Sequence, residues 1–573
     1  MKRCLLIVLL LFGSLSLQEI QARSYSSVYE FSSKFELDSL DAANPVVLDN
    51  LEVLGRVWGF VKYHHPAMAD TTIHIDYELF DLLPRVTHAK PSERNHILSE
   101  WIESFGPYEV MDSVDYAETL SKVDHMIVND FGWIQDTCRL GAVLSRQLTD
   151  LRRAVAKSNR YVWNTPITIQ FYDDPFVEIG KRREYDARFR LLMLFRLWNV
   201  IDCYSPNRNI TDRAWDEVLV EYIPRMIREK DRFALTYLEL LSTLDDAHVR
   251  TPLNIIFGAK PVLGKGHIID GHLFITDPMG GDKLRVGDEI LVTDGRSVSE
   301  MIELVRKYVA QSNENTLLRD AARYSLQGKG DSLRIEYIRD GERRQVTLPT
   351  WDNYRDYNAR IPVKEPFRML EDSIAYLYYA SLTSEIAPHL FEQIKGTKAL
   401  IVDLRCYPGD FFVLDKFFAN YFMERPCVPV KLYVPYWWSP GIFFYEPSQS
   451  FGRSEQKEES LCYVENSDAY KGKVFILVNE STQSAAEFVT MHLQSIPGAI
   501  TVGSQTAGAD GDIVKVMMPG DLSFYFSSIK VLYPDGTDTQ RVGVRIDYEV
   551  KPTIEGVKNG RDEVLEYALS LVD

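Results

Sequence analysis

Two stretches in the N-terminal half share one pattern of apolar and polar positions. Residues 51–58 and 191–198 both read Leu-x-x-Leu-x-Arg-x-Trp, at an offset of 140 residues. Helical spacing puts the leucines and tryptophan of each stretch on one face. Further pairs follow at the same offset: Pro66 with Pro206, Asp76 with Asp216, and Pro84-Arg85 with Pro224-Arg225. Residues 23–250 are therefore expected to form a helical region with two repeated units, about 46–105 and 186–245, that stack on each other.

Short apolar runs separated by turn residues follow, from about 251 to 350. Asp340-Gly341 supplies a tight turn, which predicts a hairpin over 333–348. An amphipathic helix is predicted over 298–311. The run 284–291, followed by Asp294-Gly295, resembles a PDZ domain. Such domains bind extended peptides by adding a strand to their edge. A packing module without a ligand is the alternative.

From residue 360 to 573 the pattern alternates between buried strands and helices. Apolar runs at 374–379, 399–404 and 474–478 predict strands of a layered α/β core. After the third run, apolar residues recur at helical spacing from Ala485 to Ile496. Ser484 therefore lies where a strand turns into a helix, beside free backbone N–H groups and the positive end of the helix dipole. This position can stabilise a developing oxyanion, but Ser484-x-x-Glu487 is also a capping box, which needs no catalysis.

The start of the chain and its charge restrict the class of protein. Met1-Lys2-Arg3 and the apolar run 4–12 precede a plausible cleavage site at Ile20-Gln21-Ala22, which predicts a signal peptide over residues 1–22. No later run is long and apolar enough to span a bilayer, so we expect an exported, soluble protein of the periplasm or extracellular space. A net charge of −18 argues against nucleic acid as a partner. The sequence contains no cluster of cysteines or histidines that would predict a metal site. No cofactor is expected.

The motifs downstream of Ser484 resemble a known peptidase family. Gly503-Ser504-Gln505-Thr506-Ala507-Gly508 is followed by Tyr533-Pro534-Asp535-Gly536, Gly543-Val544 and Lys551-Pro552-Thr553, and is preceded by Asp403-Leu404-Arg405. In this order and spacing they resemble the C-terminal-processing (tail-specific) serine peptidases, over about residues 245–573. The resemblance implies a crotonase-like (ββα) catalytic core. The expected fold is then multidomain α+β, with a helical repeat region, a small β-rich PDZ-like domain at 251–350 and this core.

The resemblance also assigns candidate catalytic roles. Ser484 is the nucleophile candidate, with Ser481 as the fallback. Lysine-dependent members carry the lysine where this chain has Ala509, and Lys515 lies six residues further on. The histidine-based, tricorn-like branch fits better, because Asp246-Ala247-His248 resembles its histidine segment and the first repeated unit lacks a matching histidine. In that branch a serine precedes the histidine and a glutamate completes a tetrad, where this chain has Ala247 and Gln540.

Gln540 is expected to accept a hydrogen bond from the imidazole and fix its tautomer, without the charge compensation of a carboxylate. Oxyanion donors would be the backbone N–H groups of Ala485 and Gly409, although only Gly409 remains of the usual glycine-rich loop, which here reads 406–410. The sequence predicts an exported serine peptidase acting on peptides or protein tails, with a homo-oligomer possible. Two alternatives stay open: an inactive or weak peptide-binding relative, and an exported serine esterase.

Overall fold

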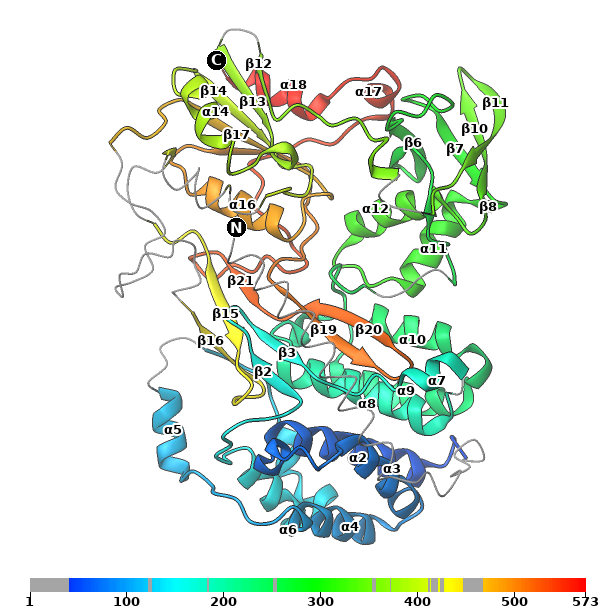
Figure 1. Cartoon of the computed structure of the whole chain (residues 1–573), viewed down its shortest axis with the longest axis vertical. Coiled ribbons are helices and arrows are strands. Elements are labelled where there is room, and N and C mark those ends of the chain that lie inside the picture. Colours follow the sequence, from blue (N-terminus) through cyan, green and yellow to red (C-terminus); the bar gives the residue numbers. More distant parts are fainter. Residues whose placement is uncertain are drawn as a thin grey trace.

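The computed structural model describes residues 41–121, 126–182, 185–250, 255–352, 357–370, 373–410, 413, 421–422, 427–446 and 467–572. The predicted signal peptide, 1–22, lies outside these residues. The described chain mixes helices and sheets in several parts, as the sequence predicts (Figure 1). No helix in the described ranges has the length and apolar character to cross a membrane.

The N-terminal part is mainly helical. Its long helices α2 and α8 pack against each other so closely that a Cβ added at Gly59 would overlap the side chain of Asn199. Both helices are buried on nearly every side, so the predicted apolar face is only part of a surface that neighbouring helices cover all round. The helices are α2 (Pro45–His64), α3 (Ile75–Val86), α4 (Pro91–Ser104), α5 (Ser113–Ser121), α6 (Thr137–Leu151), α7 (Val177–Arg182), α8 (Ala187–Tyr204), α9 (Trp215–Arg228) and α10 (Phe233–Ser242).

The two tryptophans of the shared pattern make matching contacts. The indole N–H of Trp58 donates to the carbonyl of Ile75 at 2.8 Å, and that of Trp198 donates to the carbonyl of Trp215 at 2.9 Å. Each bond ties a long helix to the first residue of the next long helix. Both partners lie at the 140-residue offset of the sequence pattern. The tryptophans therefore have a structural role, because a buried indole N–H needs an acceptor.

A separate antiparallel sheet follows, with strand order β11-β10-β7-β6-β5. The predicted hairpin is confirmed, since Ser332 pairs with Pro349 and the turn residues Asp340 and Gly341 both have positive φ. The predicted helix over 298–311 is α11, which ends at Tyr308. The elements are β4 (Lys260–Pro261), β5 (Lys265–Ile269), β6 (His272–Asp277), β7 (Glu289–Thr293), β8 (Arg296–Ser297), α11 (Val298–Tyr308), α12 (Glu314–Ser325), β9 (Gln327–Gly328), β10 (Ser332–Arg339) and β11 (Glu342–Pro349).

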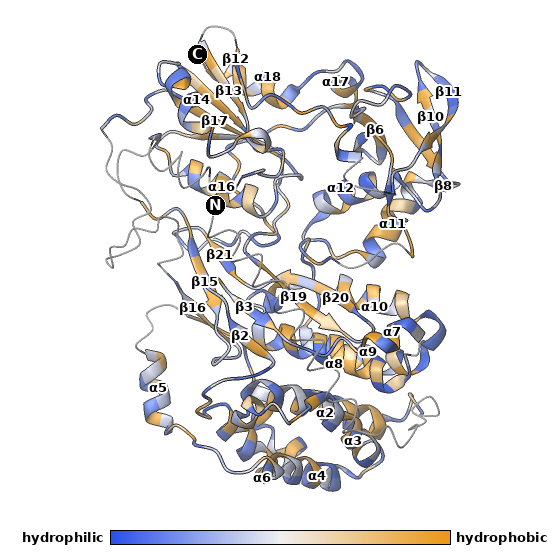
Figure 2. Ribbon diagram, viewed as in Figure 1, coloured by the Kyte–Doolittle hydropathy of each residue, from blue (hydrophilic) through white to orange (hydrophobic). Residues whose placement is uncertain are grey.

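The C-terminal part is built on a sheet with strand order β12-β13-β14-β17-β18-β22, in which all neighbours but β12 and β13 pair in parallel. The three strands predicted from apolar runs are β13, β14 and β17. Helices α14 and α16 pack on one face and α18 on the other, which explains why these strands are apolar throughout (Figure 2). The elements are β12 (Phe367–Leu370), β13 (Ile374–Tyr378), α14 (Ala387–Ile394), β14 (Ala399–Asp403), β17 (Lys473–Val478), α16 (Ala485–Gln494), β18 (Ile500–Gly503), β22 (Tyr548–Glu549), α17 (Ile554–Lys558) and α18 (Glu563–Ser570).

Strands from distant parts of the chain join the C-terminal and N-terminal parts. A four-stranded sheet has the order β1-β16-β15-β21, so that β1 of the N-terminal part pairs with β16. The hairpin β19–β20 buries Val514, Val516, Met518, Phe524 and Phe526 in the same core as the N-terminal helices, and it extends toward α8 in Figure 1. The strands are β1 (Met126–Val128), β2 (Val162–Asn164), β3 (Ile169–Phe171), β15 (Lys431–Pro435), β16 (Ile442–Tyr445), β19 (Ile513–Met518), β20 (Leu522–Ser527) and β21 (Lys530–Leu532).

Arg196 of α8 holds this junction together. Its guanidinium is fully buried and donates to the carboxylate of Asp76 at 2.9 Å and to the carbonyl of Met517 at the end of β19 at 2.7 Å. It also lies 3.4 Å from the carboxylate of Asp173, which is likewise fully buried and paired with Lys62. The arginine of the sequence pattern is therefore the centre of a buried charge network within the N-terminal part. Its bond to the carbonyl of Met517 links this network to the C-terminal part.

Replacing Arg196 with methionine should lower the free energy of unfolding by about 3–5 kcal/mol, because it leaves buried carboxylates without their partner. Urea unfolding followed by tryptophan fluorescence measures this effect. The matched control is Arg343→Ala, which removes an exposed pair with Glu336 and should cost less than about 1 kcal/mol. Equal losses in the two variants would contradict the assigned role of Arg196.

Candidate active site

Ser484 begins α16 directly after the turn that leaves β17. Its backbone has φ 57° and ψ −121°, a left-handed region that costs a non-glycine residue free energy. Its N–H donates to the carbonyl of Ala509 at 2.9 Å and approaches the carboxylate of Glu487 at 3.2 Å. A strained backbone conformation persists only where surrounding contacts hold it in place. Such residues are typical of functional sites.

Glu487 is the buried acceptor around which the motif 503–509 folds. Its carboxylate accepts the hydroxyl of Thr506 at 2.5 Å and the N–H groups of Gly508 and Ala509 at 2.7 and 3.0 Å. Gly508 has φ 61°, and a Cβ there would lie 2.6 Å from the backbone of Arg541, so the position requires glycine. Burial raises the pKa of Glu487 in spite of these donors. The motif 503–509 thus forms a cradle of donors around the Glu487 carboxylate, and the same carboxylate also holds the N–H of Ser484.

The predicted oxyanion donors lie on two different elements. Ala485 is the first residue of α16, and none of the hydrogen bonds among the described residues uses its N–H, as expected at a helix N-terminus. Gly409 follows β14 and is exposed, and a Cβ there would lie 2.4 Å from the carbonyl oxygen of Ala380. The close approach explains why this glycine is needed.

His248 lies in the loop after α10 and is 2% exposed. Its Nδ1 is 2.8 Å from the hydroxyl of Ser527, the last residue of β20. The two carboxylate oxygens of Asp246 accept the N–H of His248 at 2.9 Å and that of Ser527 at 2.8 Å. Burial lowers the pKa of His248, and the charge of Asp246 partly opposes this effect.

Gln540 is buried next to the cradle of Glu487. The N–H of the following residue, Arg541, donates to the carbonyl of Gly508 at 2.7 Å. The amide Nε2 of Gln540 has no hydrogen-bond partner among the described residues. The bond expected between Gln540 and His248 is not among the hydrogen bonds of these residues, in which Ser527 is the partner of Nδ1.

The segments that carry Ser484 and His248 contact each other through their neighbours. Gln483 donates from its side-chain amide to the carbonyl of Ala247 at 3.2 Å. Arg319 of α12 donates to the same Gln483 side chain at 2.7 Å and to the carbonyl of Glu480 at 3.0 Å. No hydrogen bond between Ser484 and His248 themselves is present in the described residues. Such bonds are often long without substrate and tighten when it binds.

Four residues of this region were not predicted from the sequence as site residues: Asp246, Arg319, Asp510 and Ser527. Asp510 follows Ala509, is 3% exposed, and has a carboxylate oxygen with no hydrogen-bond partner among the described residues. Burial and the nearby charge of Glu487 raise its pKa well above the ordinary range. The sequence gives no signal for Asp510, because this residue carries no motif of its own and its burial near Glu487 depends on the fold.

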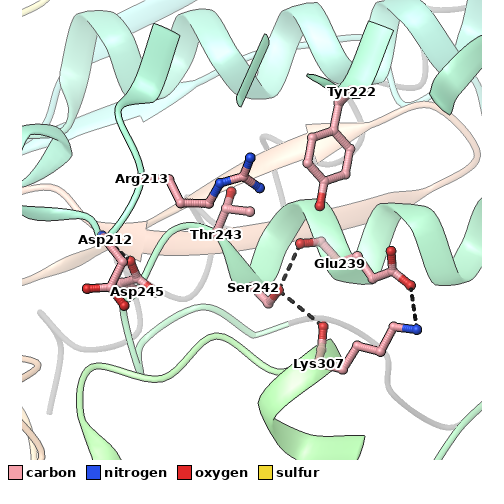
Figure 3. A pocket seen from close by; sticks show the side chains of 8 residues that line it. All are labelled: Asp212, Arg213, Tyr222, Glu239, Ser242, Thr243, Asp245 and Lys307. Atoms are coloured by element: carbon pink, nitrogen blue, oxygen red, sulfur yellow. Dashed lines mark hydrogen bonds and ion pairs between the residues drawn. The ribbon is translucent and has the colours of Figure 1, made fainter. Parts of the chain in front are cut away.

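A cavity of about 310 Å³ lies beside the loop that leads to His248, between α9, α10 and α11. Figure 3 shows the guanidinium of Arg213 and the hydroxyl of Tyr222 pointing into it, with Glu239 and Lys307 on one side and Asp212 and Asp245 on the other. None of the predicted catalytic residues lines this cavity. In the described ranges, no group of three or more histidine, cysteine, aspartate or glutamate side chains is arranged to hold a metal ion.

The raised pKa of Asp510 predicts a pH-dependent stability. The unfolded chain releases this proton near pH 3.9, whereas the folded chain retains it to higher pH. The unfolded state therefore binds fewer protons in between, and stability falls as pH rises through that range. Asp510→Asn should be as stable as the wild type near pH 4 and more stable above it, by about 1.4 kcal/mol for each unit between the two pKa values.

Urea unfolding from pH 4 to 8 checks this expectation. The control is Asp535→Asn, at an aspartate whose pKa is lowered to about 2 by the Thr537 N–H, with Arg545 adding to the effect. That variant should not gain stability with rising pH. A stability difference between Asp510→Asn and the wild type that does not change with pH would show that Asp510 is ionised throughout.

Comparisons with known proteins identify the C-terminal part. No curated protein shows a significant sequence match to the chain. The structure of mature CPAF complexed with lactacystin aligns with 67% of this chain and 98% of its own, at 15% identity and a TM-score of 0.49. The photosystem II D1 C-terminal processing protease aligns with 65% of this chain and 98% of its own, at 18% identity and a TM-score of 0.38. The tricorn protease aligns with 67% of this chain and 37% of its own, at 15% identity and a TM-score of 0.34.

The family is given by the sequence match. Residues 373–550 match the model of peptidase family S41. This segment contains the sheet from β13 to β22, the strained Ser484 and the cradle of Glu487. The C-terminal part of the chain therefore carries a peptidase family S41 segment, which supports a serine-type peptidase.

Proposed function

We propose that this chain is an exported serine peptidase that hydrolyses peptides or protein tails through an acyl-enzyme on Ser484, with His248 as the general base. The observation that carries the proposal is the backbone of Ser484, strained to φ 57° at the start of a helix and held by Ala509 and Glu487. A hydroxyl in this position lies next to the unpaired N–H of Ala485, where an oxyanion can be stabilised.

The proposed reaction follows from this placement. His248 takes the proton of the Ser484 hydroxyl as the serine oxygen bonds to the carbonyl carbon of the substrate. The N–H groups of Ala485 and Gly409 are the proposed donors to the oxyanion that forms. The imidazolium then gives its proton to the leaving amine, and the C–N bond breaks. Water, deprotonated by the same imidazole, hydrolyses the ester and restores Ser484.

Histidine rather than lysine is the proposed base. The position at which relatives with a Ser-Lys pair carry the lysine is Ala509, which is fully buried and serves Ser484 and Glu487 through its backbone. Lys515 lies on β19 with its side chain exposed. His248 lies in a segment joined to that of Ser484 by the Gln483–Ala247 hydrogen bond, which favours it over Lys515.

The division of the chain is part of the proposal. Residues 1–22 would be a signal peptide, 23–250 a helical region with two repeated units, 251–350 a PDZ-like domain and 360–573 a crotonase-like catalytic core. The equivalent tryptophan contacts support the repeat. The antiparallel sheet with α12 packed beside its edge strand β5 is consistent with a PDZ-like domain. Export to the periplasm or beyond is part of the proposal and rests on the sequence, and a homo-oligomer is possible.

The first test is covalent labelling of Ser484. A fluorophosphonate should label the wild type once, and Ser484→Ala should lose both the label and peptidase activity while its unfolding transition stays in place. Ser481→Ala is the matched control from the same turn and should keep both. Labelling of Ser484→Ala at the wild-type level would reject Ser484, and absence of labelling in the wild type would favour the inactive, peptide-binding alternative. Labelling with hydrolysis of esters but not of peptides would favour the esterase.

The second test is the pH dependence of kcat/KM. The base must be neutral, so activity should rise with pH through the pKa of His248, which burial holds below the ordinary value of about 6.5. His248→Ala should remove this rise and lower kcat at least 100-fold. Lys515→Ala should keep most of the activity. Loss of activity in Lys515→Ala with activity retained in His248→Ala would require a Ser-Lys mechanism.

A further inference from the structure

A closed ring of hydrogen bonds joins the loop of His248 to the end of β20. Asp246 accepts the N–H of His248 with one carboxylate oxygen and the N–H of Ser527 with the other, at 2.9 and 2.8 Å. The hydroxyl of Ser527 and Nδ1 of His248 close the ring at 2.8 Å. All three side chains are at least nine-tenths buried, so solvent does not compete for these contacts.

We propose that Ser527 orients the imidazole of His248 and that Asp246 compensates the positive charge which His248 acquires during the reaction. This inference rests on the proposed function. It assigns to Ser527 and Asp246 the roles that the sequence resemblance suggests for a serine at position 247 and a carboxylate at position 540, where this chain has Ala247 and Gln540. Both are positioning residues, since they act on the reaction through His248.

The Ser527 hydroxyl can donate to Nδ1 or accept from it. The carboxylate of Asp246, 3.9 Å from Nδ1, favours the tautomer that carries its proton on Nδ1. A neutral imidazole has one N–H donor and one acceptor nitrogen. If Nδ1 carries the proton and donates to the Ser527 hydroxyl, the lone pair is left on Nε2, where it can accept the proton of Ser484. The opposite tautomer would place the lone pair toward Ser527 and disable the base.

Asp246 opposes the other influences on the charge of His248. Arg250 and Arg319 both disfavour its protonation, as does burial, and Asp246 is the group that favours it. The nearer oxygen of Asp246 lies 3.9 Å from Nδ1. Proton transfer from Ser484 creates an imidazolium in this surrounding, so the Asp246 charge stabilises the state that precedes acyl transfer.

The N-terminal part of the chain fixes the position of Ser527. The preceding residues Phe524 and Phe526 are buried in the core shared with the N-terminal helices. The next residue, Ser528, has its hydroxyl 2.7 Å from that of Thr168, and Arg196 holds the carbonyl of Met517 on the paired strand. The hairpin β19–β20 thus fixes Ser527, and through it the imidazole of His248, relative to the N-terminal helices.

The simpler explanation is that Ser527 only satisfies a buried histidine. The two explanations differ in which measurements change. A structural contact affects stability, whereas an orienting contact also affects the tautomer of His248 and kcat. The matched control is Ser528→Ala, which removes a neighbouring hydroxyl that bonds to Thr168 and Asp512 and not to His248.

The experiment combines kinetics with NMR of ¹⁵N-labelled histidine. Ser527→Ala should lower kcat at least 10-fold with little change in KM, and Ser527→Thr should restore most of it because it keeps the hydroxyl. Asp246→Asn should lower kcat and shift the rise of activity to lower pH. Ser528→Ala should stay within about threefold of the wild type, the general acid–base contribution of His248 being about 100-fold or more.

The NMR measurement is made in the Ser484→Ala background, so that it does not depend on activity, with His248→Ala to assign the resonance. It should show Nδ1 protonated in neutral His248 and a mixture of tautomers after Ser527→Ala. An unchanged tautomer and an unchanged kcat in Ser527→Ala would overturn the proposal, as would a loss of kcat in Gln540→Ala without one in Ser527→Ala. Failure of the fluorophosphonate to label the wild type would instead contradict the proposed function, and the tautomer would still test Ser527.

Discussion

The C-terminal part depends on the satisfaction of one buried carboxylate. Glu487 is inside the protein, where an unpaired charge would be costly, and it is surrounded by the Thr506 hydroxyl and the N–H groups of Gly508, Ala509 and Ser484. These donors come from two segments separated by β18. Satisfying the carboxylate therefore brings the segments together and fixes the unusual backbone of Ser484. The helix that begins there can then present the N–H of Ala485, which has no hydrogen bond among the described residues, beside its hydroxyl.

The helical N-terminal part is tied to this site by buried polar contacts and a shared core. The hairpin β19–β20 leaves the C-terminal part and buries its apolar face among helices of the N-terminal part, the last of which ends at Ser242. Arg196 reaches from the middle of α8 to the carbonyl of Met517 and to buried carboxylates. A charge network of this kind does not add much stability compared with an apolar core, but the bond from Arg196 to Met517 ties β19 to α8. The same arrangement determines where the end of β20 lies.

The sequence predicted the elements with strong local patterns. The apolar run before Ser484 and the helical spacing after it correspond to β17 and α16, because a doubly covered parallel strand must be apolar on both faces. The turn at Asp340-Gly341 could also be predicted from the sequence, because few residue types adopt a positive φ at two successive positions. The long helices were predicted less completely, because α2 is buried on nearly all sides and a one-sided pattern understates its contacts.

The contact between His248 and Ser527 could not be predicted, because the two residues are far apart along the chain. Ser527 lies 279 residues from His248, in a strand whose local pattern indicates only an alternation of buried and exposed positions. The resemblance pointed to Ala247 and Gln540 because it compares positions in the sequence, whereas an imidazole responds to whichever hydroxyl and carboxylate lie beside its Nδ1. A departure from the motif of a family therefore does not by itself indicate a lost activity. It poses the question of which other side chains lie beside the imidazole, and in this chain Ser527 and Asp246 lie next to Nδ1 of His248.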